Sequence, residues 1–312
     1  MNAPADPLAT PIAPVVARVR GSRLPRPLHL FLRAANTVLA NRMARIGAGI
    51  LLVMVLVAIF APLVAPYSPT DTGFGRSLGP SAAHWLGTTG SGQDALARLL
   101  FGARVSLLVA FAAGVLATAI AIAVGLFAGY LHGVAEETIN FVVNLFLVIP
   151  ALPLMIVIAT YLPGRGVGVI VLVVVLTGWA WGARVLRAQT ATLRTRDFVA
   201  AAEFSGERPH RIVFREILPN MVSLVAASFL GAATAAVLGE AGLEFIGLGS
   251  PDTVSWGTML FWAQNDSALL TGQWAQILAP GLAIALLAAS LSLINFGVDA
   301  LSNPRLREGV AP

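Results

Sequence analysis

The 312-residue sequence contains no cysteine and no lysine. Without cysteine the chain can form no disulfide and has no thiolate nucleophile, and the redox state of its compartment stays open. Without lysine it has neither the P-loop lysine that contacts nucleotide phosphates nor the amine that Schiff-base chemistry needs. The absence of lysine excludes a conventional nucleotide-hydrolysing motor within this polypeptide.

Charge is also scarce, because only 11% of the residues are charged while 57% are apolar. This balance is typical of proteins that cross a membrane several times and not of soluble domains. All twenty basic residues are arginine, and the net charge is +5. Their distribution follows membrane topology, as shown below, so we expect contact with membrane lipid and not with nucleic acid.

Six stretches lack any charged residue and approach or exceed the roughly 20 residues that a helix needs to cross a bilayer. They lie at 46–66, 105–130, 139–162, 167–183, 219–239 and 278–298. We expect the fourth to continue past Arg184, and the third to bend at Pro150 and Pro153. The fold class predicted is an all-α membrane protein with six transmembrane helices.

The domain organisation follows from these spans. Residues 1–43 form an N-terminal tail whose first part, rich in proline and alanine, is expected to be disordered. Residues 44–301 form the transmembrane domain, and residues 302–312 form a C-terminal tail. An even number of spans places both tails on the same side of the membrane.

The arginines indicate which side that is. With the N-terminus in the cytoplasm, all but four of the twenty arginines fall on cytoplasmic segments. The four outside are Arg76, Arg98, Arg104 and Arg165. Since cytoplasmic loops carry an excess of basic residues, we expect both termini and residues 195–220 to lie in the cytoplasm, where ATP is.

The expected outer segments run from Tyr67 to about Arg104, across a short turn at Pro163–Val167, and from about Leu248 to Ile277. Four tryptophans lie in or beside them, as an interfacial aromatic belt requires: Trp85, Trp256, Trp262 and Trp274. His84 is expected to anchor the interface beside Trp85. A short helix on the membrane surface is expected around Trp256–Trp262.

The stretch Thr195–Asn220 is polar and charged, yet it lies between two apolar runs. Its first half predicts a short helix with one face formed by Phe198, Ala201, Ala202 and Ser205. Gly206 is the expected stop, because glycine adopts the left-handed conformation of a helix C-cap. Pro209 suits the first turn of a second helix, expected to end near Leu218-Pro219. Two short helices between spans suggest docking of a soluble partner, with small alanines allowing close approach.

This stretch resembles the cytoplasmic coupling loop of ABC importer permeases. The shared pattern is Ala-Ala-x3-Gly followed by Leu-Pro, and the matching residues are Ala201, Ala202, Gly206, Leu218 and Pro219. The family's usual glutamate falls on Ala200, and its usual isoleucine falls on Glu216. The resemblance implies that residues 188–218, with Phe198 on the exposed face, contact an ATPase.

Other stretches resemble the C-type inner-membrane subunit of dipeptide, oligopeptide and nickel importers. His84 to Thr88, Gly92 to Asp94 and Leu99 to Leu107 are similar to its first outer loop, with Gln93 in place of the usual arginine. Further matches are Ile149-Pro150 with Leu152-Pro153, Leu238 to Gly249, Ser255 to Gly257, Pro280-Gly281 and Asp299 to Arg307. The resemblance covers about residues 40–308.

This resemblance implies a type I importer permease, multi-pass in a bacterial inner membrane. Its implied partners are a homologous permease subunit in a heterodimer, two ATPase subunits or domains, and a periplasmic or lipid-anchored substrate-binding protein. ATP and Mg²⁺ would be bound by the ATPases, and this chain would bind no cofactor and hydrolyse nothing. The substrate class would be di- or oligopeptides or a related small solute, with the individual substrate left open.

Glu240 and Glu244 lie four residues apart near the outer end of the fifth span, so they share a helical face. Carboxylates inside a membrane are candidates for function. Glu240 matches the family pattern and is a candidate pathway or gate residue. Glu244 lies close to the expected outer boundary, where water can solvate it. The four histidines show no metal-ligand spacing, so no metal site is predicted.

Two alternatives use the same spans without ATP. An intramembrane protease is one, but neither Gly-x-Ser-Gly nor Gly-x-Gly-Asp occurs in the sequence. A simple channel is the other, but a channel has no need of a long cytoplasmic docking loop. An intramembrane enzyme would copurify without an ATPase and turn over a substrate alone.

Overall fold

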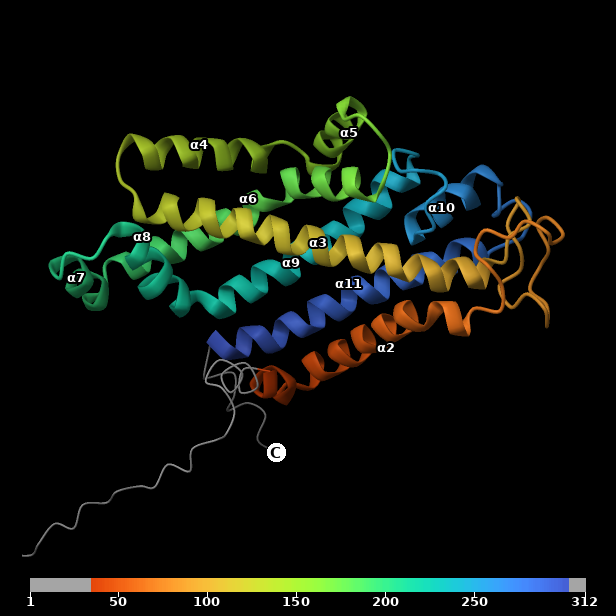
Figure 1. Ribbon diagram of the computed structural model, residues 1–312, viewed down its shortest axis with the longest axis horizontal. Helices are drawn as coiled ribbons and strands as arrows, with labels where there is room; N and C mark the ends of the chain where they lie inside the picture. Colours follow the sequence, from red (N-terminus) through yellow and green to blue (C-terminus); the bar gives the residue numbers. More distant parts are fainter. Residues whose placement is uncertain (1–34, 303–312) are drawn as a thin grey trace, which may run out of the picture.

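The computed structural model describes residues 35–302, and all regular secondary structure in that range is helical apart from one isolated β-bridge between Thr88 and Asp94 (Figure 1). The elements are α2 (Arg42–Val64), α3 (Ala95–Tyr130), α4 (Val134–Val148), α5 (Ala151–Tyr161), α6 (Val167–Arg194), α7 (Asp197–Phe204), α8 (Pro209–Arg211), a π-helical turn η1 (Ile212–Ile217), a 3-10 turn η2 (Leu218–Met221), α9 (Val222–Phe245), α10 (Trp256–Asn265) and α11 (Ala275–Ser302). Of the expected tails, residues 1–34 and 303–312 lie outside the described residues, and residues 35–40 are helical.

Within the described chain, five helical runs are long and apolar enough to cross a membrane. They are α2, α3, α6, the run Pro209–Phe245 and the run Ala275–Asp299. The pair α4 and α5 meets the same test only when taken together. The number of candidate spans is therefore five, or six when this bent pair forms one span.

The third expected span is broken and not merely kinked. The axes of α4 and α5 differ by 96° across the break. The physical reason is Pro150, whose ring fixes φ at −58° and holds the preceding Ile149 in an extended conformation with ψ 128°. Pro153 lies in the first turn of α5, where a missing N–H is tolerated.

Helix α3 begins ten residues earlier than the uncharged stretch that predicted it. Asp94 caps its N-terminus, because the carboxylate accepts a hydrogen bond of 2.7 Å from the N–H of Ala97. The helix then runs for 36 residues, through Arg98 and Arg104. Charged side chains marked the expected limit of the span, but they do not end a helix.

The core is built on close contact between α3 and α6. Gly125 and Gly129 lie one turn apart on α3, and a Cβ added at either would lie 2.7 Å from the carbonyl oxygen of Ala183 or 2.6 Å from that of Arg187. Only glycine lets the two backbones approach this closely, as in other membrane helix pairs. Helix α2 meets α11 in the same way, because a Cβ on Gly47 would lie 2.5 Å from the carbonyl oxygen of Ser290.

The long helices run roughly along one direction and define two ends of the molecule (Figure 1). Helices α7 and α8 lie at one end, while α10 and the loop of residues 65–94 lie at the other. Helices α4 and α5 lie on the outside of the α3–α6 pair. Helix α9 joins the two ends, so it positions both of the sites described next.

Candidate functional site

Helix α7 ends as its sequence predicts. Gly206 has φ +74°, its N–H donates to the carbonyl of Glu203 at 3.0 Å, and the N–H of Glu207 donates to the carbonyl of Ala202 at 3.1 Å. These two hydrogen bonds form a Schellman motif, which needs the left-handed conformation at its central residue. Gly206 therefore turns the chain from α7 towards α8.

The faces of α7 differ from the expectation at one residue. Phe198, Ala201 and Ser205 are exposed, as predicted, but Ala202 is half-buried and packs against an apolar cluster. Val199 is fully buried in that cluster with Ile212. Sequence reasoning missed Val199, although a lone branched aliphatic residue among alanines is a signal for the buried face.

Polar contacts tie α7 to the end of α3. The hydroxyl of Tyr130 donates to Oε1 of Glu203 at 2.8 Å. Arg194 then closes the end of α3, because its Nη1 donates to the carbonyls of Gly129, Tyr130 and Leu131 at 3.1–3.2 Å. These contacts join α7 to the end of α3, and Arg194 joins α6 to the same end.

The second short helix does not end near Leu218-Pro219, which corrects the expectation. The helical run Pro209–Phe245 continues through η1 and η2 into α9. Pro219 has no N–H to donate and its ring would collide with the preceding turn of an α-helix, so the backbone widens to a π turn and then tightens to a 3-10 turn. Pro219 is exposed and Leu218 is half-buried. The joint is thus helical and leaves no flexible linker between α8 and α9.

At the opposite end of α9, two carboxylates are buried together. Glu240 is 0% and Glu244 1% exposed. The hydroxyl of Ser106 on α3 donates to Oε1 of Glu240 at 3.1 Å, and the hydroxyl of Ser255 donates to Oε2 of Glu244. The expectation that water solvates Glu244 is wrong, because α10 and the residues before it cover this carboxylate.

Helix α10 is held tightly over these carboxylates. Ser255 caps its first turn through a reciprocal pair of hydrogen bonds with Thr258. A Cβ on Gly257 would lie 2.8 Å from the Cβ of Glu244 and 3.0 Å from the Cα of Ala241, so no larger residue fits. The expected short helix is thus present, but it packs against α3, α9 and α11.

Two residues of the expected aromatic interface are buried instead. Trp256 is 2% exposed, and its indole N–H donates to the carbonyl of Leu99 at 3.0 Å. His84 is 7% exposed and its Nδ1 lies 2.8 Å from Oδ2 of Asp94. The polar group of each ring is used inside the fold, whereas Trp85 and Trp274 are exposed as an interfacial position requires.

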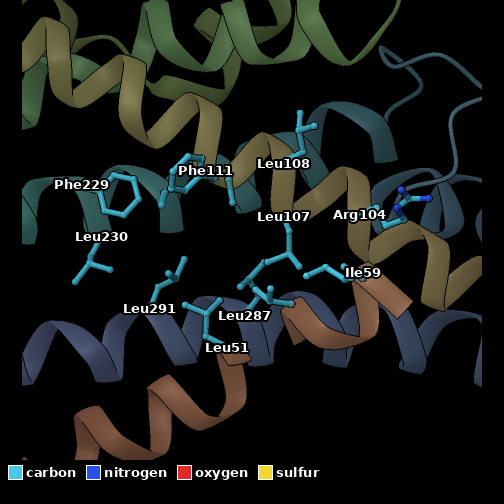
Figure 2. Close-up of a pocket in the computed structure, with 14 residues that line it drawn as sticks. Leu51, Ile59, Arg104, Leu107, Leu108, Phe111, Phe229, Leu230, Leu287 and Leu291 are labelled. Atoms are coloured by element: carbon cyan, nitrogen blue, oxygen red, sulfur yellow. The ribbon is translucent and has the colours of Figure 1, made fainter. Parts of the chain in front are cut away.

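A groove of about 670 Å³ lies between α2, α3, α9 and α11 (Figure 2). Its walls are leucine, phenylalanine, alanine, valine and isoleucine side chains, with Arg104 at one end. Figure 2 shows Phe111 and Phe229 at one side of the groove and Leu287 and Leu291 at another. Walls of this kind give a polar solute no hydrogen bond. Within residues 35–302, no group of three or more metal-binding side chains is present.

These features define a multi-pass helical membrane protein with a helical element displayed at one end. A family model described as "Binding-protein-dependent transport system inner membrane component" matches residues 121–308. A second, described as "N-terminal TM domain of oligopeptide transport permease C", matches residues 30–80. The chain belongs to this family of transport-system permeases, on the branch of the C-type subunit, and it is a multi-pass protein of the bacterial inner membrane.

Individual relatives agree over nearly the whole chain. A protein of Brucella suis named as a peptide permease is 34% identical over 290 residues, which cover 92% of this chain and 95% of that protein. The oligopeptide transport system permease protein OppC of Mycobacterium tuberculosis is 34% identical over 279 residues, covering 87% and 94%. The dipeptide transport system permease protein DppC of Bacillus subtilis is 30% identical over 271 residues, covering 86% and 83%.

Proposed function

We propose that this chain is a transmembrane subunit of an ABC importer that moves di- or oligopeptides, or a related small solute, into the cytoplasm. The names of the relatives supply the solute class. Energy comes from ATP and Mg²⁺ bound on partner ATPases, because this chain has no lysine for a P-loop. It contributes part of the transport passage and a surface for the ATPase to contact, and it hydrolyses nothing itself.

The observation that carries this proposal is the position of α7. This helix lies at one end of the bundle and exposes Phe198, Ala201 and Gly206, while Val199 fixes its other face to the spans. An ATPase that grips the exposed face and moves would displace α7 as a unit. The buried face, the Tyr130–Glu203 bond and the helical joint at Leu218-Pro219 would pass the movement to α3 and α9.

The topology proposed has six spans, with the bent pair α4–α5 as the third and both termini in the cytoplasm. The excess of arginine on residues 184–215 supports this orientation, because it assigns the end that carries α7 to the cytoplasm. The transmembrane domain is residues 44–301 with a coupling loop at 188–218, between tails of residues 1–43 and 302–312.

The assembly proposed contains this chain, a homologous permease subunit, two ATPase subunits or domains, and a binding protein on the outer side. Alternating access follows from it. ATP binding closes the ATPases, α7 moves with them, and the spans rearrange so that the passage changes the side to which it opens. Glu240 is a candidate gate residue in this cycle, since it lies buried between α3 and α9 and a change in their separation would expose it.

Purification of the chain from native membranes tests the assembly. We expect an ATPase, a second permease and a binding protein to copurify, and ATP hydrolysis to drive solute uptake in proteoliposomes. A chain that purifies without an ATPase and turns over a substrate alone would be an intramembrane enzyme, and the proposal would be rejected.

Substitution of Gly206 by valine tests the coupling role. Valine in the left-handed conformation costs roughly 1–2 kcal/mol or more, so the turn after α7 should distort. We expect ATP hydrolysis without matching uptake, with membrane insertion unchanged. Gly164→Val is the matched control, because Gly164 also has positive φ and open space around it but belongs to the α5–α6 turn. Normal transport by Gly206→Val with full ATPase affinity would show the assignment of this loop to be wrong.

Glu240→Ala tests the gate. We expect a changed uptake rate with the ATPase still bound, because Glu240 lies far along α9 from the coupling loop. Unchanged uptake kinetics would leave Glu240 with a structural role only.

A further inference from the structure

A second hollow, of about 270 Å³, lies between α3, α6 and α9. Its lining consists of small residues and two tryptophans: Ala117, Thr118, Ala121, Gly178, Trp179, Trp181, Gly182, Ser228, Gly231, Ala232 and Ala235. Thr118 lies near the midpoint of the uncharged stretch 105–130, so in the proposed topology it lies near the middle of the hydrocarbon core.

Two hydroxyl groups in this hollow are buried and unpartnered. Thr118 is 6% and Ser228 4% exposed, and neither Oγ1 of Thr118 nor Oγ of Ser228 has a hydrogen-bond partner among the described residues. Other hydroxyls on the same helices bond to their own backbone: Thr177 to the carbonyl of Val173 at 3.0 Å, and Thr234 to that of Leu230 at 2.8 Å. The two hydroxyls of the hollow are therefore available to something that enters it.

Part of the hollow is open. A Cβ added at Gly178 or Gly231 would meet no atom within 4 Å, whereas one added at Gly182, 3.9 Å from Oγ of Ser228, would lie 3.0 Å from the Cβ of Ala121. On one side the hollow is bounded by Trp179, whose ring packs against Phe146 with centroids 5.2 Å apart. The small residues thus leave a space that larger side chains at the same positions would fill.

A hydroxyl left unpaired in an apolar region loses the hydrogen bonds that it makes in water, which is unfavourable. Two such groups in one hollow near the bilayer centre are best explained by a partner that carries hydrogen-bonding groups of its own. Hydroxyls donate and accept, so they can pair with either the N–H or the C=O of an amide. None of the lining residues is charged, so the hollow has no means of selecting a charged side chain.

We propose that this hollow is a transient binding site for the backbone of a peptide in transit, with Thr118 and Ser228 as its hydrogen-bonding groups. A peptide that crosses the membrane must satisfy its amides where lipid offers no partner. Contact through backbone amides also makes the site indifferent to peptide sequence. The volume is below that of pockets that enclose a drug-sized ligand, so it holds a short backbone segment. This inference rests on the proposed peptide import.

The groove of Figure 2 differs from this hollow because it lacks hydrogen-bonding side chains along its walls. It is larger but has apolar walls, with its single charged side chain, Arg104, at the end. It offers no group that could pair with an amide between its walls. The hollow between α3, α6 and α9 is thus the better candidate for contact with a peptide backbone.

Uptake by the complete complex in proteoliposomes tests the proposal, with radiolabelled trialanine and pentaalanine as probes. We expect Gly231→Leu, which fills the hollow, to lower ATP-driven uptake at least tenfold. The double variant Thr118→Val with Ser228→Ala should lower it about fivefold, with a rise in the peptide concentration needed for half-maximal uptake. Both should retain the partner subunits and ATP hydrolysis.

The matched control is Gly49→Leu on α2, where an added Cβ also meets open space, and it should transport normally. Wild-type uptake by Gly231→Leu would overturn this inference but would leave the proposed function standing. Loss of the second permease from the purified Gly231→Leu complex would also overturn it, because the hollow would then be a contact between subunits. A wild-type complex that hydrolyses ATP but takes up neither peptide would overturn the proposed function, and this inference with it.

The absence of cysteine from the chain allows a second measurement. Ser228→Cys places one thiol in the hollow, and mass spectrometry of this subunit can follow its reaction with a water-soluble methanethiosulfonate. We expect modification that trialanine slows severalfold. Leu116→Cys is the control, since Leu116 is 49% exposed on α3 but lines neither cavity. Equal rates at both positions, or no protection by peptide, would contradict a peptide site.

Discussion

The two ends of α9 are held in different ways. At the end beside α10, buried carboxylates bond to Ser106 and Ser255, and the backbone of α10 approaches so closely that Gly257 has no room for a methyl group. At the end beside α7, apolar side chains such as Val199 and Ile212 pack on one face while the other face is exposed. Apolar contacts tolerate small shifts, but buried hydrogen bonds and backbone contacts do not. If α9 moves during transport as proposed, the end beside α7 is therefore expected to shift more readily than the end beside α10.

Gly257→Ala is the change with the largest expected effect on this comparison. The added methyl group would overlap Glu244 and Ala241, so α10 must move away from α9 and a buried carboxylate would lose its cover. We expect a loss of about 2–3 kcal/mol of stability, measured by thermal unfolding of the complex in detergent. The remaining folded protein should keep a normal ratio of uptake to ATP hydrolysis.

The control for this change is Gly281→Ala on α11, where a Cβ meets no atom within 4 Å. It should unfold at the wild-type temperature. If Gly257→Ala were as stable as Gly281→Ala, the end of α9 beside α10 would be no more constrained than the rest of the molecule.

Val199→Ala has the next largest expected effect, and the quantity that it changes is the amount of solute taken up per ATP hydrolysed. Removing two methyl groups from a fully buried position costs about 2 kcal/mol, mostly by loosening α7 from the spans. We expect uptake per ATP hydrolysed to fall several-fold, together with a drop in the unfolding temperature no larger than that of Gly257→Ala. Val222→Ala, at a position 62% exposed, is the matched control. A drop in stability without any change in coupling would place Val199 in the fold and not in the coupling.

Tyr130→Phe should give the smallest effect. It removes only the 2.8 Å bond to Glu203 and leaves the ring in place, at a cost of about 1 kcal/mol. We expect a reduction in uptake per ATP of less than twofold, in the same direction as for Val199→Ala. Tyr161→Phe, at an exposed position on α5, should have no effect. A larger effect than that of Val199→Ala would mean that the polar contact, and not the apolar one, carries the movement.

Local features of the fold could be predicted from the sequence. Uncharged apolar runs indicated most of the spans, and Gly206 and Pro209 indicated the limits of the short helices, because these features depend on residues adjacent in the chain. The position of the break at Pro150 was predicted correctly, but the angle between α4 and α5 was not predicted. The 96° angle follows from the extended backbone at Ile149 and Pro150, a conformation that a proline favours for the residue before it but does not require.

Features that depend on distant segments could not be predicted. Glu244 and His84 were expected near water, but α10 covers one and a loop encloses the other. The hollow between α3, α6 and α9 was not predicted either, since its residues come from three separate spans. Small residues are common in this chain, and only their convergence in space marks a site.

The 36 residues of α3 have a further consequence. At 1.5 Å per residue the helix is about 54 Å long, well beyond a hydrocarbon core of ~30 Å. One continuous rod therefore carries Asp94 and the docked loop of residues 65–94 at its first turn, and Tyr130 beside α7 at its last. A tilt of this rod would swing both extremities in opposite directions at once. A contact made on that loop and a contact made on α7 would then be coupled mechanically, without any signal relayed from residue to residue.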